Sequence, residues 1–419
     1  MLKWFKKLGS AGTIMLAMVL GGVLGFVLKD YYATWSVVTI PIGDVFLRLL
    51  KMTILPFIFC SIITGIASVA DLKKLKQIGI RFLAYWAAVS ALAAISGIVF
   101  AYLIKPGVGI RLGDASEAYS TEGVSVIQSI VEWVPDNVFA SFSNFNIIQV
   151  IVFALFLGVG ISMIGEKPKA VLNNFFDAGE KVMSKTIEIV MKTAPIGVFA
   201  LMANMTGDLG LDALGALAKM LLTQYVSYLV IMLVVFPLFL KIGKVSVLQH
   251  YKNIYPVMVM GFATCSSAAS LPLAMKVTKE RCGVPAETVN LIAPPAATIS
   301  QQACCAEMPI YAIFAAQLYG REYSLGEIAL LVLLGIITAA GVAGIPGGGI
   351  MMCAIMLQTM GLPLTIVPWV AGIYRLIDMP NTMLNIVGDT VGMVMISSQM
   401  GDLDRDVFYD KPGARASAA

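Results

Sequence analysis

Apolar runs long enough to cross a membrane recur along the chain. A helix that crosses the hydrocarbon core needs about 20 apolar residues, and such runs lie at 11–29, 36–66, 80–104, 127–163, 170–205 and 211–240. The second, fourth and fifth exceed one straight crossing, so we expect them to tilt, kink or break. Within the fourth, the polar stretch PDNVFASFSNFN predicts several short helices. The pattern predicts an all-α polytopic membrane protein.

The pattern changes after residue 240. MVMGFATCSSAASLPLAM is interrupted by serine, threonine and proline, and the helix predicted from Ala286 to Tyr319 follows it. TAAGVAGIPGGGIMMCAIM is interrupted by glycine and proline, and a second polar-striped helix follows it. The flanking lysines predict that the first copy begins on the cytoplasmic side of the membrane and the second on the outer side. The two copies would then form an inverted repeat. Interrupted segments at matching positions in two halves indicate the binding site of a transporter.

The two interrupted segments are expected to form re-entrant hairpins. Unpaired backbone N–H and C=O groups are not tolerated against lipid, so irregular backbone belongs in the protein interior or beside a water-filled cavity. There, free N–H groups can hold a carboxylate and free carbonyl groups can hold a cation. The alternative is a face rich in small residues that lets helices pack closely.

A polar stripe marks the second striped helix, within RLIDMPNTMLNIVGD. Its members are spaced 3, 4, 3 and 4 residues apart, which places them on one helical face; they are Arg375, Asp378, Thr382, Asn385 and Asp389, with Asn381 bordering them. Ionisable residues inside a membrane usually line a pathway or pair with each other. The stripe therefore predicts a binding site.

Each member of the stripe has a candidate role. Asp378 can receive an ammonium group, and Thr382 and Asn381 can hydrogen-bond the polar groups of a substrate. Asn385 and Asp389 can supply oxygen ligands to a hard cation such as Na⁺. Arg375 can instead form an ion pair with Asp378 that only stabilises packing.

Pro380 lies in the middle of this face. It lacks a backbone N–H, so it frees the carbonyl group of Leu376. We expect a local distortion of the helix at this point.

Composition supports a membrane protein that is not an enzyme. Of the 419 residues, 58% are hydrophobic and 13% are charged, and the mean hydropathy is +0.86, whereas soluble domains are about 25% charged. The net charge of +4 is too small to indicate nucleic acid as a partner. No HExxH, GxSxG or phosphate-loop motif occurs. We expect no cofactor beyond a coupling ion, Na⁺ or H⁺.

Charge in the loops predicts the topology. Lysine and arginine lie at 3–7, 73–81 and 241–252, whereas 105–126 and 206–213 carry acidic residues. The positive-inside rule places the lysine-rich loops and both termini in the cytoplasm, and the chain in the cytoplasmic (inner) membrane. The six cysteines are expected to be small packing residues without disulfides. The single histidine, His250, lies among lysines and is expected to be solvated.

Four motifs together resemble the dicarboxylate/amino acid:cation symporter family, which includes archaeal aspartate transporters and mammalian glutamate and neutral amino-acid carriers. They are TCSSAASLP, PAATI, AGIPGGG and DMPNTMLNIVGD. The resemblance covers nearly the whole chain. It implies a homotrimer of eight transmembrane helices and two re-entrant hairpins per protomer, in which a transport domain moves across the bilayer like an elevator.

The resemblance also implies domain boundaries. The scaffold comprises spans 1 and 2 (1–77) and spans 4 and 5 within 127–240. The transport domain comprises span 3 with its loop (78–126), span 6, and a core at 241–399. That core holds hairpin one (244–278), helix seven (286–319), hairpin two (324–361) and helix eight (363–398). A cytoplasmic tail follows at 400–419.

The resemblance assigns the site residues. Substrate contacts are expected from both hairpins and helix eight, at Ser266, Ser267, Ile345, Gly349, Arg375, Asp378, Asn381, Thr382 and Asn385. Cation contacts are expected at Ser300, Asn385, Asp389 and Glu307. The motif NMDGT in sodium-coupled acidic amino-acid carriers is replaced here by Ser300 to Cys304. Trp86 and Val89 replace two sodium ligands of helix three. One sodium site is therefore expected to be absent. A second sodium site is expected to retain only some of its ligands.

Substrate specificity is expected to differ as well. Acidic-substrate members carry an arginine where this chain has Asn381, and an asparagine cannot hold a carboxylate bidentately. We therefore expect a small neutral or polar amino acid as the substrate. Three alternatives stay open: cystine, because ATISQQACCAEMP resembles the cystine-transporting branch; a dicarboxylate, with Arg375 as the clamp; and a substrate-gated anion conductance.

Two further residues have family counterparts. Some members place an arginine where this chain has Cys265, and Arg375 can serve the same pairing with Asp378. Proton-coupled members use a glutamate where this chain has Met308, next to Glu307. Because neighbouring helical positions differ by about 100°, Glu307 is either a proton carrier or a hydrogen-bonded structural acid.

Overall fold

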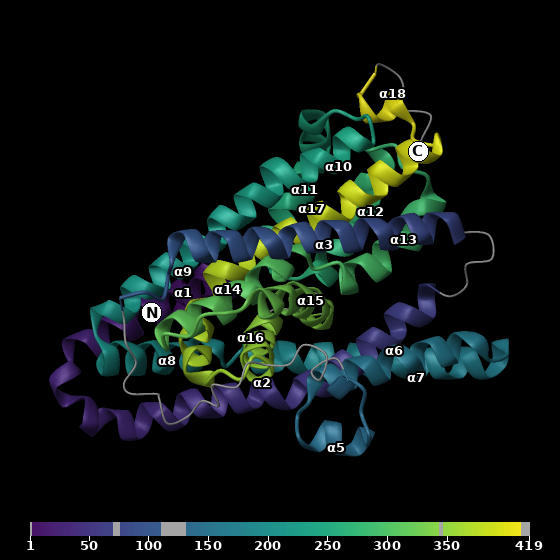
Figure 1. Cartoon of the computed structure of the whole chain (residues 1–419). Helices are drawn as coiled ribbons and strands as arrows, with labels where there is room; N and C mark the ends of the chain where they lie inside the picture. The colour runs from purple at the N-terminus through teal and green to yellow at the C-terminus, as the bar shows by residue number, and fades with distance from the viewer. Residues whose placement is uncertain (1, 70–75, 110–130, 343–346, 412–419) are drawn as a thin grey trace.

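In the computed structural model, the described residues are 2–69, 76–109, 131–342 and 347–411. This part of the chain is helical and contains no strand (Figure 1). The first half comprises α1 (Leu2–Val27), α2 (Tyr32–Val69), α3 (Lys76–Ile104), α5 (Val138–Ser143), α6 (Ile147–Met163), α7 (Glu166–Met191), α8 (Ala194–Leu209), α9 (Leu211–Val230) and α10 (Phe236–Ile242). A π-helical turn, Ile231–Val235, joins α9 to α10.

The second half carries the two interrupted segments. It comprises α11 (Val247–Thr264), α12 (Ser267–Glu280), α13 (Ala286–Ile299), α14 (Gln302–Leu318), α15 (Leu325–Val342), α16 (Gly348–Thr359), α17 (Val367–Met400) and α18 (Arg405–Phe408). Short 3-10 turns precede α2 and α17, at Lys29–Tyr31 and Leu364–Ile366.

Several helices are long and apolar enough to cross a membrane. Within the described residues these are Lys29–Thr64, Gln77–Ile104, Leu214–Ile242 and Leu325–Val342, and the bent pair α7 and α8 would make a fifth. The chain is therefore a multi-pass membrane protein. The count of eight spans stays a prediction.

The three overlong runs behave differently. The first of them forms α2, one helix of 38 residues that continues through Pro41 and Pro56. The next divides into the short helices α5 and α6, as its polar middle predicts. The last breaks between α7 and α8, which meet at 56°. Pro195 opens α8 and cannot donate to the carbonyl group four residues earlier, which explains the break.

The first interrupted segment forms two helices joined by a sharp turn. Cys265 ends α11 in the left-handed conformation, with φ 52° and ψ 35°. Ser266 is extended and caps α12, because its Oγ accepts from the backbone N–H of Ala269 at 3.2 Å. The run of small polar residues thus interrupts the helix where the sequence predicts an interruption.

The second interrupted segment is described on both sides of its tip. Helix α15 precedes it, and Gly347 opens α16 with a left-handed φ of 83°. The tip itself, including Ile345, lies outside the described residues. The prediction that Ile345 contacts substrate therefore stays a prediction.

The helix predicted over 286–319 is wrong as a single helix. It divides into α13 and α14 at Ser300 and Gln301. Side chains from elsewhere satisfy the backbone that the break frees: Trp86 Nε1 donates to the carbonyl oxygen of Ile299 at 3.0 Å, and the N–H of Ala303 donates to Asn385 Oδ1 at 2.8 Å. Because these partners lie on other helices, the local sequence does not show the break.

Helix α17 runs through the interior of the second half. It packs against α11, α12, α13, α14 and α16, and also contacts α3, α8 and α9. In Figure 1 it extends from the centre of the molecule to the end where α10, α18 and the C-terminus lie. The interrupted segments therefore surround the predicted polar stripe.

Candidate functional site

The polar stripe of α17 is buried from Asp378 to Asp389, whereas Arg375 is partly exposed. Two contacts within the stripe join residues four apart. Asn385 Nδ2 donates to Asn381 Oδ1 at 2.7 Å, and the Thr382 hydroxyl lies 3.4 Å from Asp378 Oδ1. These contacts agree with the predicted helical face. Asp378 approaches the start of α16, whereas Asn381 and Asn385 approach α14.

Glu307 is the centre of the contacts on the α14 side. Its carboxyl group is buried and accepts hydrogen bonds from three donors. Tyr311 Oη donates at 2.6 Å, Tyr228 Oη donates at 3.2 Å, and Asn381 Nδ2 donates as well. Asn381 Nδ2 also lies 3.2 Å from Tyr228 Oη. Asn381, at the position predicted to set specificity, is therefore hydrogen-bonded to an acid.

Asn385 connects α17 to the break between α13 and α14. Its Nδ2 donates to Gln301 Oε1 at 2.7 Å, and its Oδ1 accepts from the N–H of Ala303 at 2.8 Å. On the same side, the Cys304 thiol donates to Asn381 Oδ1 at 3.3 Å. The amide groups of α17 thus hold the irregular backbone of the break in place.

Asp378 and Arg375 face the two interrupted segments. The N–H of Gly347 donates to Asp378 Oδ2 at 3.4 Å. Arg375 Nη2 donates to the carbonyl oxygen of Ala263 at 3.3 Å, two residues before Cys265. Within the described residues no salt bridge joins Arg375 to Asp378, although the Arg375 charge acts on the Asp378 carboxyl group. The alternative that Arg375 only pairs with Asp378 stays a prediction. Arg375 Nε is buried without a partner within the described residues.

Gly349 places its backbone directly beside the site. Its N–H donates to Tyr374 Oη at 3.1 Å. A Cβ at this position would overlap the Tyr374 hydroxyl and would lie 2.9 Å from Glu307 Oε1. Glycine is therefore the residue that permits this close approach of α16.

Asp389 is a buried acid that has no basic partner in the described part of the chain. Its Oδ1 has no hydrogen-bond partner within the described residues. Ser300, which is buried at the break, lies 2.5 Å from the amide of Gln302 through its Oγ. Next to Asp389, the carbonyl oxygen of Gly388 accepts from Tyr85 Oη at 2.6 Å. A buried carboxyl group in this setting needs a bound cation or a proton to neutralise it.

The serine-rich turn contributes one unused hydroxyl. Ser266 Oγ caps α12, whereas Ser267 Oγ is buried and has no partner among the described residues. Ser270 Oγ donates to the carbonyl oxygen of Ser266 at 3.0 Å. The N-terminus of α12 therefore presents free polar groups, which is the arrangement that favours a carboxylate.

The expectation that His250 is solvated is wrong. The side chain is fully buried, and its Nε2 lies 3.2 Å from Thr390 Oγ1. The Thr390 hydroxyl donates to the carbonyl oxygen of Val387 at 2.8 Å, so His250 Nε2 must be the donor to Thr390. Packing of α11 against α17 removes the ring from water, which the neighbouring lysines do not indicate. The six cysteines are free thiols, as expected, and all but Cys60 are buried.

Sequence reasoning missed the tyrosines of the site. Tyr311 is four residues after Glu307, so helical spacing could have found it. Tyr374 precedes Arg375 and points to α16 instead of α11. Tyr228 comes from α9, and nothing in its local sequence indicates its contact with Glu307 and Asn381. Three hydroxyl groups therefore surround a site that the sequence analysis built from α14, α17 and the interrupted segments alone.

A helical multi-pass chain whose interrupted helices surround a buried polar stripe has the features of a secondary transporter. Residues 11–399 match the Sodium:dicarboxylate symporter family, and the chain belongs to this family. Its family and relatives are transporters and not enzymes.

Three relatives are similar to this chain over most of its length and most of their own. The proton/sodium-glutamate symport protein of Geobacillus stearothermophilus is 30% identical over 412 residues, which is 96% of this chain and 97% of the relative. The proton/glutamate-aspartate symporter of Escherichia coli (strain K12) is 30% identical over 95% of this chain and 94% of its own. The C4-dicarboxylate transport protein of Cupriavidus necator is 30% identical over 91% and 90%.

Proposed function

We propose that this protein is a secondary-active symporter for a small neutral or polar amino acid in the cytoplasmic membrane. The observation that carries the proposal is the hydrogen bond between Asn381 and Glu307. Acidic-substrate relatives are expected to hold the substrate's side-chain carboxylate with an arginine at this position. Here an amide stands in its place and a carboxyl group stands behind it. A second carboxylate from the substrate would meet an acid and no cation.

The rest of the site is suited to an α-amino acid. Asp378 can receive the ammonium group, and its nearest polar contacts, Gly347 and Thr382, are long at 3.4 Å each. Free polar groups at the start of α12, with Ser267 among them, can receive the α-carboxylate. Asn385 is held rigidly by Gln301 and Ala303, so it can position the substrate without reorganising.

A competition assay tests the substrate class. Uptake of labelled serine into proteoliposomes should be inhibited by unlabelled serine and other small polar amino acids, and not by aspartate or succinate. Inhibition by aspartate or succinate in preference to serine would overturn the proposal. Cystine belongs in the same panel, because the segment from Ala297 to Pro309 resembles the cystine-transporting branch.

A dicarboxylate is the second candidate substrate. The names of relatives such as the C4-dicarboxylate transport protein favour it, and so does the buried Arg375 Nε that has no partner within the described residues. Arg375 could then clamp one carboxylate of a diacid. Under this alternative, Arg375→Ala would abolish succinate binding. Under the amino-acid proposal, succinate does not bind the unmodified protein.

Ion coupling is proposed to be altered from a three-sodium scheme. The family name and the relatives' names point to sodium or protons as coupling ions. The Trp86 side chain has an N–H donor and no oxygen that could bind a cation. Its N–H donates to the carbonyl oxygen of Ile299 beside the break, and this carbonyl oxygen would otherwise be available as a cation ligand. Asp389, Ser300 and Asn385 remain as the candidate cation or proton site.

Glu307 is proposed to be a structural acid and not the proton carrier. Its two oxygens accept from Tyr311, Tyr228 and Asn381, which satisfies the carboxylate without a proton. Uptake measured under separate sodium and pH gradients tests the coupling. Coupling to three sodium ions would contradict the altered scheme, and loss of proton-driven uptake in Glu307→Gln with sodium-driven uptake retained would restore the carrier role.

The assembly and the movement follow from the family resemblance. We propose a homotrimer in which 1–77 and spans 4 and 5 form the scaffold, while 241–399 forms the core of a transport domain with two re-entrant hairpins. The packing of α11, α12, α13, α14 and α16 against α17 supports one compact moving unit. A trimer mass in detergent, and crosslinks between scaffold and core that change with substrate, would test this arrangement.

A further inference from the structure

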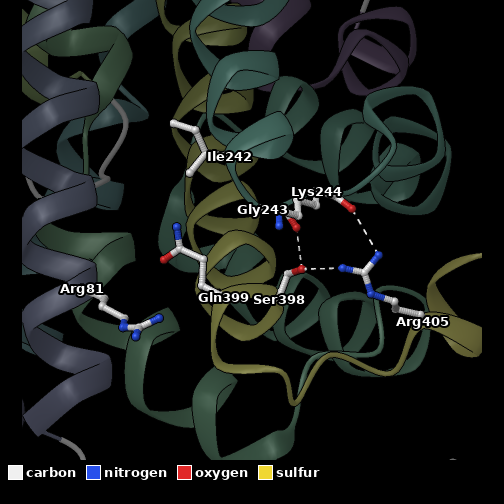
Figure 2. Close-up of a pocket in the computed structure, with 7 residues that line it drawn as sticks. All are labelled: Arg81, Ile242, Gly243, Lys244, Ser398, Gln399 and Arg405. Atoms are coloured by element: carbon white, nitrogen blue, oxygen red, sulfur yellow. Dashed lines mark hydrogen bonds between the residues drawn. The ribbon is translucent and has the colours of Figure 1, made fainter.

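A pocket rich in positive charge is lined by residues other than those of the candidate site. It has a volume of about 460 Å³ and is lined by Arg81, Ile242, Lys244, Ser398, Gln399 and Arg405, together with Gly243. Arg81 comes from the start of α3, Lys244 from the turn after α10, and Arg405 from α18. Figure 2 shows Arg81 on one side of the pocket and Arg405 on the other. Three segments remote in sequence thus bring three cations together.

No acid compensates this charge. Neither aspartate nor glutamate lines the pocket, and Arg81 has no hydrogen-bond or ion-pair partner within the described residues. Arg405 donates to the carbonyl oxygen of Lys244 at 3.2 Å and to Ser398 Oγ at 3.0 Å, which are both neutral acceptors (Figure 2). The net charge of the pocket is therefore positive.

Of the three acids nearest in sequence, Asp402 is exposed and does not line the pocket, and the other two are engaged elsewhere. Asp404 Oδ1 accepts from the N–H groups of Asp406 and Val407, both at 3.0 Å, and so caps α18. Asp406 pairs with Lys411 at 2.6 Å. Helix α18 is thereby fixed with the Arg405 guanidinium directed toward Ser398.

We propose that this pocket binds a phosphate group. Arginine side chains match phosphate oxygens with paired N–H donors. The Gln399 amide can add a neutral contact, whereas the Ser398 hydroxyl already donates to the carbonyl oxygen of Gly243. The pocket lies at the end of the molecule that the lysine-rich loops assign to the cytoplasm, where anionic headgroups accumulate. Ile242, which is half-exposed at 48%, supplies an apolar edge for an acyl chain. The phosphate can belong to an anionic lipid or to a soluble phosphate compound.

The test uses one charge reversal and a matched control. Arg81→Glu changes a cation that has no structural contact of its own. Lys252→Glu makes the same charge change at an exposed lysine of α11 outside the pocket. Purified, delipidated protein is titrated with phosphatidylglycerol and with phosphatidylcholine, and binding is read by native mass spectrometry. Inorganic phosphate is titrated separately against chloride at equal ionic strength, with the melting temperature as the readout.

The proposal predicts that the unmodified protein prefers phosphatidylglycerol or is protected by inorganic phosphate. Arg81→Glu should weaken that binding by at least about fivefold, and Lys252→Glu should leave it within about twofold. Lipid binding without an effect of inorganic phosphate identifies a headgroup, and the reverse identifies a soluble phosphate compound. Equal losses in both variants, or no preference for either phosphate source, would overturn the proposal. An unchanged size-exclusion profile shows that each variant is folded.

Discussion

Asn381 shows at the scale of one residue how a neighbour changes what a position can recognise. Its amide is hydrogen-bonded to the Glu307 carboxyl group and lies 3.2 Å from the Tyr228 hydroxyl. An arginine introduced there would meet the same carboxyl group. Because a charge-assisted pair between arginine and glutamate is stronger than a neutral contact, Glu307 would take the new guanidinium before a substrate could.

This contact predicts that two substitutions are needed before the protein binds an acidic substrate more tightly. Asn381→Arg alone should not improve aspartate binding, because Glu307 neutralises the arginine. Asn381→Arg combined with Glu307→Gln should improve it by about tenfold or more, the value of a charged hydrogen bond. Aspartate competition against labelled substrate measures both, with Glu307→Gln alone as the control. Equal aspartate affinity in the single and double variants would contradict the proposed role of Glu307.

The sequence predicted the residues of α17 because helical spacing is a local property. Asp378, Thr382 and Asn385 are all buried, and Thr382 lies against Asp378 four residues away, as their spacing indicates. Tyr228 could not be predicted, because only the tertiary packing of α9 brings it to Glu307. His250 was predicted wrongly for the same reason: its sequence neighbours are lysines, but its spatial neighbour is Thr390.

At the scale of the element, irregular positions in helices are stabilised by side chains of other helices. These side chains form hydrogen bonds with the backbone groups that have lost their helical partners. Pro380 leaves the carbonyl oxygen of Leu376 without its helical partner. Tyr225 Oη on α9 donates to that oxygen at 2.8 Å, and α17 continues through the proline. The backbone hydrogen bond that Pro380 removes is therefore replaced by one from another helix. Helix α17 continues without interruption at the point where a distortion was expected.

Removing this compensation should destabilise the protein slightly. Tyr225→Phe should cost about 1 kcal/mol, because it leaves the Leu376 carbonyl oxygen unpaired, and should lower the Tm by about 2 °C. Tyr255→Phe is the control, because the hydroxyl of this exposed tyrosine has no hydrogen-bond partner within the described residues. Thermal unfolding in detergent measures both. Equal Tm shifts in the two variants would contradict the assigned role of Tyr225.

The close approach of α16 gives a second prediction at this scale. Gly349→Ala should lower substrate affinity by about tenfold or more, since the new Cβ displaces the Tyr374 hydroxyl and crowds Glu307. Gly160→Ala in α6 is the matched control, because a Cβ there meets nothing within 4 Å. Substrate binding by competition measures the change.

A double variant separates a steric cause from a general loss of folding. Adding Tyr374→Phe to Gly349→Ala removes the overlapping hydroxyl, so part of the affinity should return. No recovery, together with normal affinity in Tyr374→Phe alone, would argue against this steric explanation.

The division between α13 and α14 marks the limit of prediction from local sequence. Ser300 and Gln301 are compatible with a helix, and neither glycine nor proline stands at the break itself. The break depends on Trp86 of α3 and Asn385 of α17, which pair the freed backbone groups. By contrast, the serine-rich turn at Cys265 and the glycine-rich start of α16 carry their own local signals and were predicted.

At the scale of the whole molecule, the apolar pattern predicts a helical multi-pass membrane protein, and the comparison with known families confirms a symporter family. The pairing of each interrupted segment with a polar-striped helix predicts a site beside α17, and the structure packs α11, α12 and α16 against that helix. Trimer formation, elevator movement and the sidedness of the termini are not encoded in local periodicity, because they depend on contacts with other protomers and with lipid. They stay predictions.

Substrate and coupling are the central claims at this scale, and uptake into proteoliposomes tests them together. Labelled serine, cystine, aspartate and succinate are offered in turn, each under an imposed sodium gradient and, separately, an imposed pH gradient. We predict concentrative uptake of a neutral or polar amino acid with fewer than three sodium ions, or with protons. Uptake of aspartate or succinate in preference to neutral amino acids, coupled to three sodium ions, would contradict the account.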